Sequence, residues 1–577
     1  MITQKGTINM TNNLHNLYLQ IISDGTHYKK EFDEIAKNPS EYNKNLLLNL
    51  LKSNASTEFG QLHDFANITS VEKYKNSMPI TKYDDYAPYI DRMIHEHQDN
   101  LLTSYPISHY MESSGTQGTA KYLPLSNPSK EIINTLSKQL FSRICDLMGD
   151  TWTYDKLLML IIPADRTLND YADRNSLSTE LFIGIFEDNM SDFVVSPMLA
   201  YEKGRTVDTQ YLHAMFALSD ENMRSIFSPF MSFILEFIHY VNVNKEMLIQ
   251  NIEMGTIDAS INISEEDRST LLPMIKPNKE RAVQLREIFE TYPHTWPQKV
   301  WPNLELILST CSGSFLECTE VVRRYVGDDI NIMGLGFGSS ECVFSMPVEL
   351  NQNDAVLLPH TGFFEFLPLG ESNYTKTLTL DEIEVGKDYE ILVTTISGLY
   401  RYQMRDAVTV TGTYFNTPKI QFSHRIDQTV NIFGEKTSEL LLRKIVYETA
   451  SENGLNIQDY SVYPDTTSSP MRYVFFIEFV NDVLSISREQ MQESMEKKLR
   501  SANFLYDLFS SSGKLAPLEL HILQKNSYIN YKQYLLNKGQ NISQIKPVRI
   551  ISNAKIKDFF LDYIDHKLEE SPELITN

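Results

Sequence analysis

Nine consecutive residues, Ser113 to Lys121, concentrate groups that bind anions. They read SSGTQGTAK and combine four hydroxyls, two glycines and one lysine between apolar or helical segments. Hydroxyls, backbone N–H groups and a lysine can hold a polyphosphate, and glycine lets the backbone approach it closely. The lysine does not directly follow the second glycine, as it does in a P-loop. An ordinary Ser/Gly surface turn has the same composition. Taken alone, this stretch is therefore as typical of a turn as of a phosphate site.

A second stretch, Phe337 to Cys342, reads FGSSEC and directly follows a predicted strand. Its aromatic ring, beside glycine and serine, can lie against a purine. The carboxylate of Glu341 could hold Mg²⁺ on phosphate oxygens. Taken alone, the pattern is more typical of a turn at a strand end with a surface glutamate.

A third stretch, Gly398 to Asp406, reads GLYRYQMRD and lies between two predicted strands. By analogy with dinucleotide sites, Asp406 could accept hydrogen bonds from ribose hydroxyls. It could equally be an aspartate in a hairpin turn. Arg401 and Arg405 would then lie on a solvated face of the sheet.

Two further positions come late in the chain. The run His424 to Asp427 stands where the composition shifts, which fits a hinge or an ordinary linker with one salt bridge. Lys546 precedes a proline and is therefore expected to be extended rather than helical. A mobile loop could carry this lysine to a phosphate, although a surface lysine is the default.

Strands alternate with helices around the first two stretches, which predicts an α/β architecture. A helix is predicted from Asn127, with Pro128 in its first turn. The region from Met215 to Ile252 reads as helix-rich, and Ser487 to Leu508 reads as one helix. The apolar runs that predict buried strands are Leu157 to Ile162, Leu304 to Leu308 and Ile330 to Met333.

The pattern changes near residue 355 to short alternating strands and then, after Asp427, back to helix and strand. A chain of 577 residues exceeds what one core usually organises. We therefore predict a large N-terminal domain of α/β subdomains, residues 1–427, with a β-rich, barrel-like part at about 355–427. A smaller, mobile α+β domain would follow, residues 428–577.

Composition excludes several classes of protein. The net charge of −23 and the pI near 5.1 argue against general nucleic-acid binding. The four cysteines are too few and too scattered for a disulfide framework or a metal site, which favours a reducing, cytoplasmic compartment. The N-terminus is polar, and no apolar stretch is long enough to span a membrane. A monomer is expected.

These stretches occur in the order seen in the adenylate-forming superfamily of acyl-CoA synthetases, adenylation domains and luciferases. The resemblance is closest to its acyl-acid amido synthetase branch, the Gretchen Hagen family, and runs from about residue 30 to 560. Further segments that resemble family landmarks are Met254 to Thr256, Trp301 to Asn303, Phe364 to Pro368 and Gly539 to Arg549.

The resemblance implies a two-step ligase that uses ATP and Mg²⁺. A small-molecule carboxylic acid attacks the α-phosphate of ATP, which gives an acyl-adenylate and pyrophosphate. An amine, usually that of an amino acid, then attacks the acyl carbon and gives an amide and AMP. This chemistry depends on neutralising charge and on alignment more than on covalent participation by the protein.

The resemblance also implies roles for individual residues. Glu341 would bind Mg²⁺, Ser340 would face the α-phosphate, and Asp406 would accept hydrogen bonds from the ribose. Lys546 would swing in for adenylation, with Asp427 near the pivot of that rotation. The remaining nucleotide contacts would be Ser113, Ser114, Gly115, Thr116 and Lys121 at the β- and γ-phosphates, Ser312, Gly313 and Ser314 at the edge of the base, Phe337 on the adenine with Gly338 and Ser339, and Arg425 at the ribose or a phosphate.

One departure from the family pattern bears on this site. The family has Arg-x-Gly-Asp where this chain has Gln403 to Asp406, so Arg405 replaces a glycine. Arg405 could instead reach a phosphate or the acyl carboxylate. The acyl pocket is expected among residues 105–125, 180–240 and 315–345, and the acid and the amine are left open. Two alternatives remain: an acyl-CoA (thioester-forming) synthetase and a catalytically degenerate nucleotide-binding protein.

Overall fold

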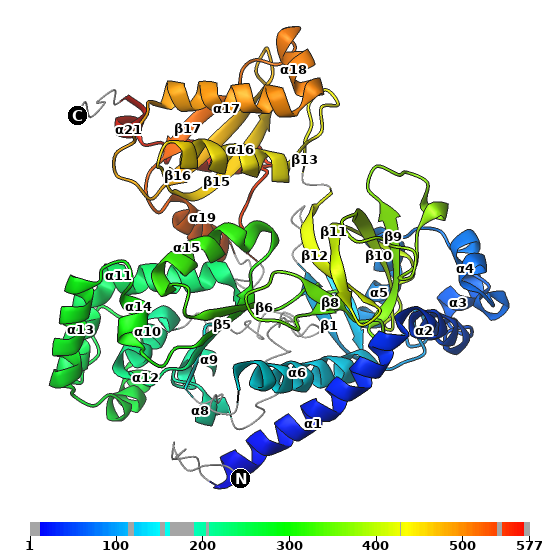
Figure 1. The fold of residues 1–577 in the computed structure, drawn as a ribbon, viewed down its shortest axis with the longest axis horizontal. Helices are drawn as coiled ribbons and strands as arrows, with labels where there is room; N and C mark the ends of the chain where they lie inside the picture. Colours follow the sequence, from blue (N-terminus) through cyan, green and yellow to red (C-terminus); the bar gives the residue numbers. More distant parts are fainter. Residues whose placement is uncertain are drawn as a thin grey trace. The chain divides into compact units, whose positions relative to one another are not determined.

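The computed structural model divides the chain into two compact units, residues 1–423 and 424–577 (Figure 1). The predicted pivot, Asp427, lies outside the described residues, so the domain boundary at 427 stays a prediction. The structure describes residues 12–113, 121–149, 156–161, 190–202, 207–426, 429–538 and 545–570.

The N-terminal unit contains a parallel four-stranded sheet. Its strand order is β3 (Leu157–Met159), β4 (Ser225–Phe230), β5 (Leu306–Thr310) and β6 (Asn331–Gly334). Three of these strands were predicted from their apolar runs, with bounds that differ by at most three residues. The α/β prediction is therefore confirmed.

Strand β4 was missed, because the region from Met215 to Ile252 reads as helical. It runs between helix α10 (Thr209–Ser219) and helix α11 (Met231–Met254). A parallel strand buried on both faces has no alternating pattern, and its apolar run continues directly into that of α11. The strand also contains Pro229, which lies where the register with β5 shifts between Phe227 and Phe230. A proline in a strand is tolerated at such irregularities.

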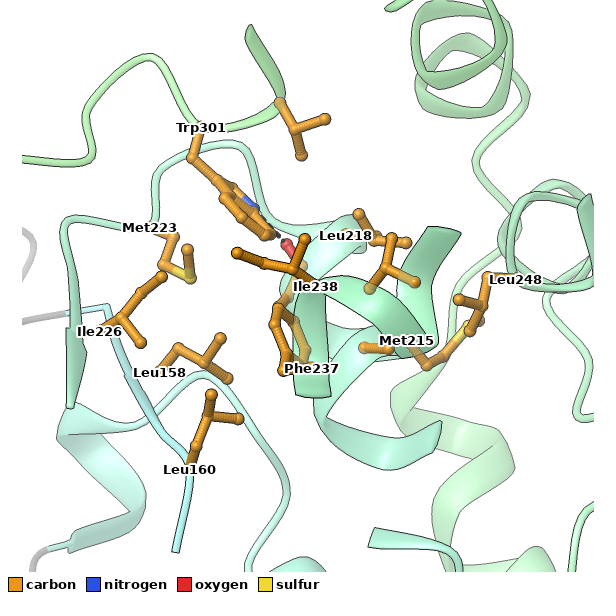
Figure 2. Close-up of a cluster of buried hydrophobic side chains, with 14 of the residues drawn as sticks. Leu158, Leu160, Met215, Leu218, Met223, Ile226, Phe237, Ile238, Leu248 and Trp301 are labelled. Atoms are coloured by element: carbon orange, nitrogen blue, oxygen red, sulfur yellow. Dashed lines mark hydrogen bonds between the residues drawn. The ribbon is translucent and has the colours of Figure 1, made fainter. Parts of the chain in front are cut away.

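One face of this sheet shares a core with helices α10, α11, α13 (Lys279–Thr291) and α15 (Leu316–Val326), of which α13 packs against α11. Figure 2 shows Leu158 and Ile226, from neighbouring strands, facing Phe237 of α11 and Trp301. The indole N–H of Trp301 donates to the carbonyl of Ala217 at 2.7 Å. Trp301 belongs to the predicted family landmark Trp301 to Asn303, so its place in the core is structural.

The opposite face packs against helix α6 (Asn127–Met148), which lies alongside helix α1 (Asn12–Lys37). Successive strand residues point to opposite faces, so Leu157 and Met159 join this second core while Leu158 joins the first. Helix α6 has a proline in its first turn, as predicted. With helices on both faces, the carboxyl ends of the strands open toward the FGSSEC stretch, which follows β6.

A six-stranded antiparallel sheet forms the predicted β-rich part. Strand β11 starts earlier than predicted, so Asp406 lies inside the strand and not between two strands. The strand order is β7 (Ser345–Met346), β8 (Ala355–Leu357), β12 (Thr417–Arg425), β11 (Tyr402–Tyr414), β10 (Asp388–Thr395) and β9 (Gly362–Pro368).

Shorter elements complete the N-terminal unit. Strands β1 (Ile107–Ser113) and β2 (Lys121–Ser126) form an antiparallel pair. The other helices of this unit are α2 (Pro39–Ser53), α3 (Glu58–Leu62), α4 (Val71–Ser77), α5 (Tyr83–His95), α8 (Met190–Phe193), α9 (Leu199–Glu202), α12 (Glu265–Leu271) and α14 (Trp296–Val300).

The C-terminal unit is built on a three-stranded sheet, in which β16 (Arg472–Phe479) pairs antiparallel with β15 (Ile457–Asp465) and parallel with β17 (Glu519–Leu523). Helix α16 (Glu439–Glu452) precedes this sheet. The helix predicted from Ser487 to Leu508 is two helices, because Asn503 caps the second through the N–H groups of Leu505 and Tyr506. The other elements are β13 (Thr429–Val430), β14 (Thr437–Ser438), α17 (Arg488–Ala502), α18 (Phe504–Ser511), α19 (Ser527–Asn537), α20 (Ala554–Leu561) and α21 (His566–Glu570).

No helix within the described ranges combines the length and apolar character that crossing a bilayer would require.

Candidate active site

The predicted phosphate loop connects two antiparallel strands. Ser113 ends β1, Lys121 begins β2, and the two are cross-strand partners. Both flanking segments are therefore strands and not helices. The residues between them, including Ser114, Gly115 and Thr116, lie outside the described part of the chain.

Lys121 is held beside the first turn of α5. Its ammonium group lies 5.2 Å from the centre of the Tyr83 ring, a cation–π contact. The N–H of Tyr122 donates to the hydroxyl of Tyr83 at 3.0 Å. Tyr83 therefore fastens both the backbone and the cation at the start of β2.

The FGSSEC stretch is a tight turn closed by its own backbone. The N–H of Ser339 donates to the carbonyl of Cys342 at 2.9 Å, and that of Phe344 to the carbonyl of Phe337 at 2.9 Å. The N–H of Glu341 donates to the hydroxyl of Ser339 at 3.2 Å. The tip of the turn thus presents Ser339, Ser340 and Glu341, all partly exposed.

The backbone conformation just before this turn requires a glycine at position 336. Its φ is +81°, a conformation that favours glycine. A Cβ at this position would lie 2.3 Å from the carbonyl oxygen of Ser345. The exit from β6 into the turn therefore cannot accept a larger residue without backbone movement.

Tyr402 connects the turn to β11. It is buried, and its phenol hydrogen-bonds the carboxylate of Glu341. Burial, reinforced by the negative charge of Glu341, raises the pKa of Tyr402, so the phenol remains a donor across the physiological range. Tyr83 is close enough to contribute to the same shift. Lys121 contacts Tyr83, Glu341 contacts Tyr402, and the two phenols interact electrostatically, although Lys121 and Glu341 are far apart in sequence.

The start of β11 is fixed by the segment that leads into α5. The hydroxyls of Thr81 and Tyr86 donate to the carbonyl of Tyr400 at 2.7 and 2.9 Å. The N–H of Gln403 donates to the carbonyl of Thr81 at 2.9 Å. These bonds fix the backbone on both sides of Tyr402, which lies between Tyr400 and Gln403.

Arg401 is not on a solvated face, as one alternative had it. Its side chain is 2 % exposed and forms two hydrogen bonds to the carboxylate of Glu365, at 3.0 and 2.9 Å. It also donates to the carbonyls of Lys75 and Met78 at 2.7 and 2.9 Å. Glu365 belongs to the predicted landmark Phe364 to Pro368, so two family landmarks meet in one buried ion pair.

Asp406 lies at an irregularity of β11. Glu390 pairs with Ala407 and Leu392 pairs with Gln403, so three residues of β11 stand opposite one of β10. Such a bulge redirects side chains and is frequent beside active sites. The side chain of Asp406 is buried.

Arg405, the residue that replaces the family glycine, keeps a glycine-like backbone. Its φ is +58°, in the left-handed region. Its guanidinium lies 3.3 Å from the carboxylate of Glu390 and is 34 % exposed. The departure from the family pattern therefore changes the side chain while the backbone still makes the turn that glycine favours.

The predicted adenine side collects three aromatic rings. Phe337 is buried, stacks on Phe344 at 4.5 Å and lies 5.4 Å from Phe422 of β12. Gly313 has a φ of +61°, and a Cβ there would lie 2.7 Å from the ring of Phe422. Ser312 is partly exposed next to it. The Ser312 to Ser314 turn and Phe337 thus meet across Phe422, although the side chain of Ser314 lies outside the described part.

The two cysteines nearest these turns are poor nucleophiles. Burial raises the pKa of Cys311 and of Cys342 to about 12, so both thiols stay protonated. Across the described side chains, no three His, Cys, Asp or Glu residues gather as a metal site would need. A single carboxylate such as Glu341 suits Mg²⁺, which proteins commonly hold with one or two carboxylates plus substrate phosphates.

Lys546 and Arg425 belong to the C-terminal unit. Lys546 is exposed, and the segment after it runs beside β15, where the N–H of Val462 donates to the carbonyl of Arg549 at 2.8 Å. Arg425 is the last residue of β12 and is partly exposed. Their roles toward a nucleotide, like those of the other predicted site residues, stay predictions.

A pocket of about 580 Å³ opens elsewhere in the N-terminal unit. It contains none of the predicted nucleotide-site residues, but six of its lining residues fall within 180–240, one of the ranges predicted for the acyl pocket. At its wall, Arg281 is buried and donates to the carbonyls of Leu218 and Val300, both at 2.8 Å. The pocket is lined by Val195, Phe216, Ser219, Asp220, Glu221, Asn222, Asn278, Glu280, Arg281 and Gln284.

Sequence analysis did not single out Tyr83, Tyr402 or Phe422. Tyr402 lies inside the GLYRYQMRD stretch, in which roles were predicted only for the charged residues. Its proximity to Glu341 depends on how β11 passes the FGSSEC turn, which no local pattern encodes. An uncharged aromatic between two arginines was the available signal.

Three family models match successive parts of the chain: the GH3 family N-terminal domain at residues 28–331, the central domain at 355–425 and the C-terminal domain at 441–555. Indole-3-acetic acid-amido synthetase GH3.4 of Arabidopsis thaliana is 27 % identical and aligns over 91 % of this chain and 92 % of its own. Jasmonoyl-L-amino acid synthetase GH3.5 of Oryza sativa subsp. japonica is 25 % identical, over 91 % and 95 %.

Solved structures agree with this assignment at the level of the fold. The structure of the Arabidopsis thaliana GH3.15 acyl acid amido synthetase with 2,4-DB superposes with a TM-score of 0.82 at 22 % identity, over 94 % of this chain and 97 % of that one. A 2-hydroxyisobutyryl-CoA ligase in its postadenylation state reaches a TM-score of 0.51 at 8 % identity, over 96 % and 92 %. The chain belongs to the GH3 family, as its motifs predicted.

Proposed function

We propose that this protein activates a carboxylic acid with ATP and transfers the acyl group to the amine of an amino acid. The observation that carries the proposal is that Lys121 lies over the ring of Tyr83, and that Tyr83 interacts electrostatically with Tyr402, the hydrogen-bond partner of Glu341. A cation and a carboxylate placed in this way suit a magnesium-bound polyphosphate. The relatives named above, which are an indole-3-acetic acid-amido synthetase and a jasmonoyl-amino acid synthetase, support the same reaction class.

The first half-reaction joins the acid to AMP. The carboxylate oxygen of the acid attacks the α-phosphorus of ATP, and the bond to the pyrophosphate oxygen breaks. Lys121, with Ser113, Ser114, Gly115 and Thr116, holds the departing β- and γ-phosphates. Glu341 would hold Mg²⁺, which would supply charge neutralisation on the phosphates, and the hydrogen bond from Tyr402 orients the Glu341 carboxylate.

The rest of the nucleotide is assigned to residues in and around the sheet edges. Phe337, Gly338 and Ser339 face the adenine together with the turn from Ser312 to Ser314, and Asp406 accepts from the ribose. Ser340 faces the α-phosphate. From the other unit, Arg425 contacts ribose or phosphate, and Lys546 stabilises the transferring phosphate before the unit turns about Asp427.

In the second half-reaction, the amine attacks the acyl carbon, the bond to AMP breaks, and an amide forms. We place the protein as a monomer, and the few and scattered cysteines of the sequence favour a reducing, cytoplasmic compartment. The acid and the amine are small molecules whose identity is a matter for assay.

Pyrophosphate release tests the proposal directly. The panel contains indole-3-acetic acid, jasmonic acid, 4-substituted benzoic acids and 2,4-DB, each with ATP and Mg²⁺, and then with the standard amino acids or CoA. Glu341→Gln should lower release about 100-fold, since it removes a charge that acts on the polyphosphate. The control is Glu320→Gln, which removes an exposed carboxylate of α15 and should leave the rate unchanged.

Two results would contradict the proposal. No pyrophosphate with any acid would favour a nucleotide-binding protein without catalysis. Release stimulated by CoA, and by no amine, would point to a thioester-forming synthetase.

A further inference from the structure

A buried arginine lies three residues after Lys546. The side chain of Arg549 is 3 % exposed and forms an ion pair with Asp459 of β15. It also donates to the carbonyl of Tyr460 at 3.0 Å. Its guanidinium lies 4.7 Å from the centre of the Tyr460 ring, a cation–π contact. These three contacts are all with residues of β15.

The backbone around Arg549 is fastened to the same strand. The N–H of Val462 donates to the carbonyl of Arg549 at 2.8 Å, and the N–H of Ile551 donates to the carbonyl of Val462 at 2.8 Å. The hydroxyl of Ser461 hydrogen-bonds the carbonyl of Val548. The segment therefore extends the sheet by one short parallel bridge at the edge formed by β15.

The chain that leads toward Lys546 is anchored as well. The buried carboxylate of Glu478, on β16, accepts from the N–H groups of Asn526 and Tyr528 at 2.7 and 3.1 Å. The hydroxyl of Tyr528 donates to that of Ser461 at 3.0 Å. These bonds fix the start of helix α19 against the same sheet. Lys546 thus lies between two anchored points, one before α19 and one at Arg549.

We infer that Arg549 is a positioning residue for Lys546, and that its pairing with Asp459 sets the point from which the lysine reaches the nucleotide. This inference rests on the proposed function, because it assigns Arg549 to the adenylation step. A chain of three residues spans at most about 10 Å, so the backbone of Lys546 cannot move farther than that from its anchor. The lysine must therefore travel with the whole C-terminal unit and not through a loop that detaches from it.

A buried ion pair is weak evidence for stabilisation, since desolvation of the two charges offsets their attraction. What Arg549 does achieve is a fixed register: its partners fit only when the segment lies in one alignment on β15. Placement errors of about 1 Å at a reacting group can lower rates about 100-fold. An effect on placement should therefore appear in the rate of adenylation, separately from any effect on stability.

Four variants separate placement from stability. Arg549→Met removes the charge and keeps an unbranched side chain, and Arg549→Lys keeps a charge without the planar fork. Asp459→Asn combined with Arg549→Met leaves no unpaired charge, so it should fold if the single variant does not. As a matched control, Arg472→Met breaks the 3.2 Å ion pair with Glu519, which joins β16 to β17 in the same sheet.

Two assays distinguish the half-reactions. Adenylation is followed by pyrophosphate release with the acid of the panel that gives the highest rate. Amide formation is followed separately, from the synthetic acyl-adenylate of that acid and an amino acid. Arg549→Met, alone or with Asp459→Asn, should lower adenylation about 10- to 100-fold and leave amide formation within about twofold.

A double variant tests whether Arg549 acts through Lys546. Because both residues serve one function, Lys546→Ala with Arg549→Met should lose no more adenylation than Lys546→Ala alone. Arg549→Lys should recover part of the loss, and the Arg472→Met control should change neither half-reaction. Faster hydrogen exchange at the N–H of Ile551 in Arg549→Met would show that the segment has been released.

Several results would overturn the inference. These are unchanged adenylation in Arg549→Met, an equal fall in both half-reactions, or multiplicative losses in the double variant. If the wild-type protein releases no pyrophosphate with any acid, the proposed function itself falls, and the inference falls with it. Activity in the wild type with no effect of Arg549→Met overturns the inference alone.

Discussion

Two buried arginines, one in each unit, use the same chemistry for different ends. Arg401 and Arg549 are 2 % and 3 % exposed, and each pairs with a carboxylate, Glu365 and Asp459 respectively. Arg401 also binds carbonyls of residues more than 300 positions away in the chain. Asp459 and Tyr460, which bind Arg549, are consecutive residues of one strand.

The role of a buried ion pair therefore depends on how far apart in the chain its partners lie, and not on how deeply it is buried. Arg401, just before β11, binds Glu365 of β9 and the carbonyls of Lys75 and Met78 at the end of α4, so it joins parts of the N-terminal unit that are distant in the chain. Arg549 fastens one short segment to one strand edge, and that segment carries Lys546. The first pair should therefore matter most for stability, and the second for the placement of a lysine.

The largest expected effect is that of Arg401→Met. It leaves Glu365 buried without its partner, which should lower the free energy of unfolding of the N-terminal unit by about 3–5 kcal/mol. Urea unfolding followed by tryptophan fluorescence measures this, because all three tryptophans lie within residues 1–423. Arg405→Met, which removes a partly exposed arginine, is the control. A loss below about 1 kcal/mol would contradict the role given to Arg401, since exposed ion pairs contribute no more than that.

The next largest effect is a dependence of stability on pH, which comes from the protonated imidazole of His521. Burial alone would lower the pKa of His521, but hydrogen bonds with Glu519 and Glu569 raise it to about 9. A raised pKa stabilises the folded state fully below the unfolded value of 6.5, and this contribution is lost as pH rises toward 9. The C-terminal unit should therefore lose up to about 3 kcal/mol over this range.

Hydrogen exchange at the amides of β16, measured at several pH values after correction for the intrinsic rate, reports this loss. His521→Gln should remove the pH dependence above 7. The contribution of Glu478 falls in a lower window, because burial raises its pKa from 4.5 to about 7. An unchanged pH profile in His521→Gln would show that the two carboxylates do not hold a charged imidazole.

A smaller effect on stability is expected for Arg549→Met. The side chain of Asp459 is 19 % exposed, so water can partly replace the lost arginine. We expect a loss of about 2 kcal/mol in the C-terminal unit, the scale of a hydrogen bond to a charged group. Exchange at the amides of β16 again provides the measurement. A loss as large as that of Arg401→Met would erase the distinction between the two arginines.

The smallest effect should be a gain. Arg405 has a left-handed backbone, which is unfavourable for any residue with a Cβ. Arg405→Gly relieves this and gives up a partly exposed ion pair with Glu390, so the N-terminal unit should gain about 0.5–1 kcal/mol. Tryptophan-monitored urea unfolding measures the gain, and Arg405→Ala is the matched control, since it removes the same ion pair and keeps the strain. Equal stability of the glycine and alanine variants would contradict the strain.

Local patterns predicted much of the fold. Helix α6 with its early proline, the strands β5 and β6, and the β-rich part near residue 355 follow from apolar spacing and turn residues that lie within each element. Strand β4 was missed because complete burial removes the alternation that marks a strand. The bulge at Asp406 was missed because it depends on how β11 pairs with β10.

By itself the sequence determined the family, through motifs whose order survives at about one-quarter identity to the named relatives. It also determined which residues could bind a nucleotide, since the chemistry of hydroxyls, glycines, a lysine and carboxylates follows from the residue type alone. Only the tertiary structure decided that Tyr83 and Tyr402 connect Lys121 to Glu341, that Arg401 is buried, and that Arg549 anchors the lysine segment. Each of these depends on contacts between residues distant in the chain, and such contacts arise only when the sheets and helices pack.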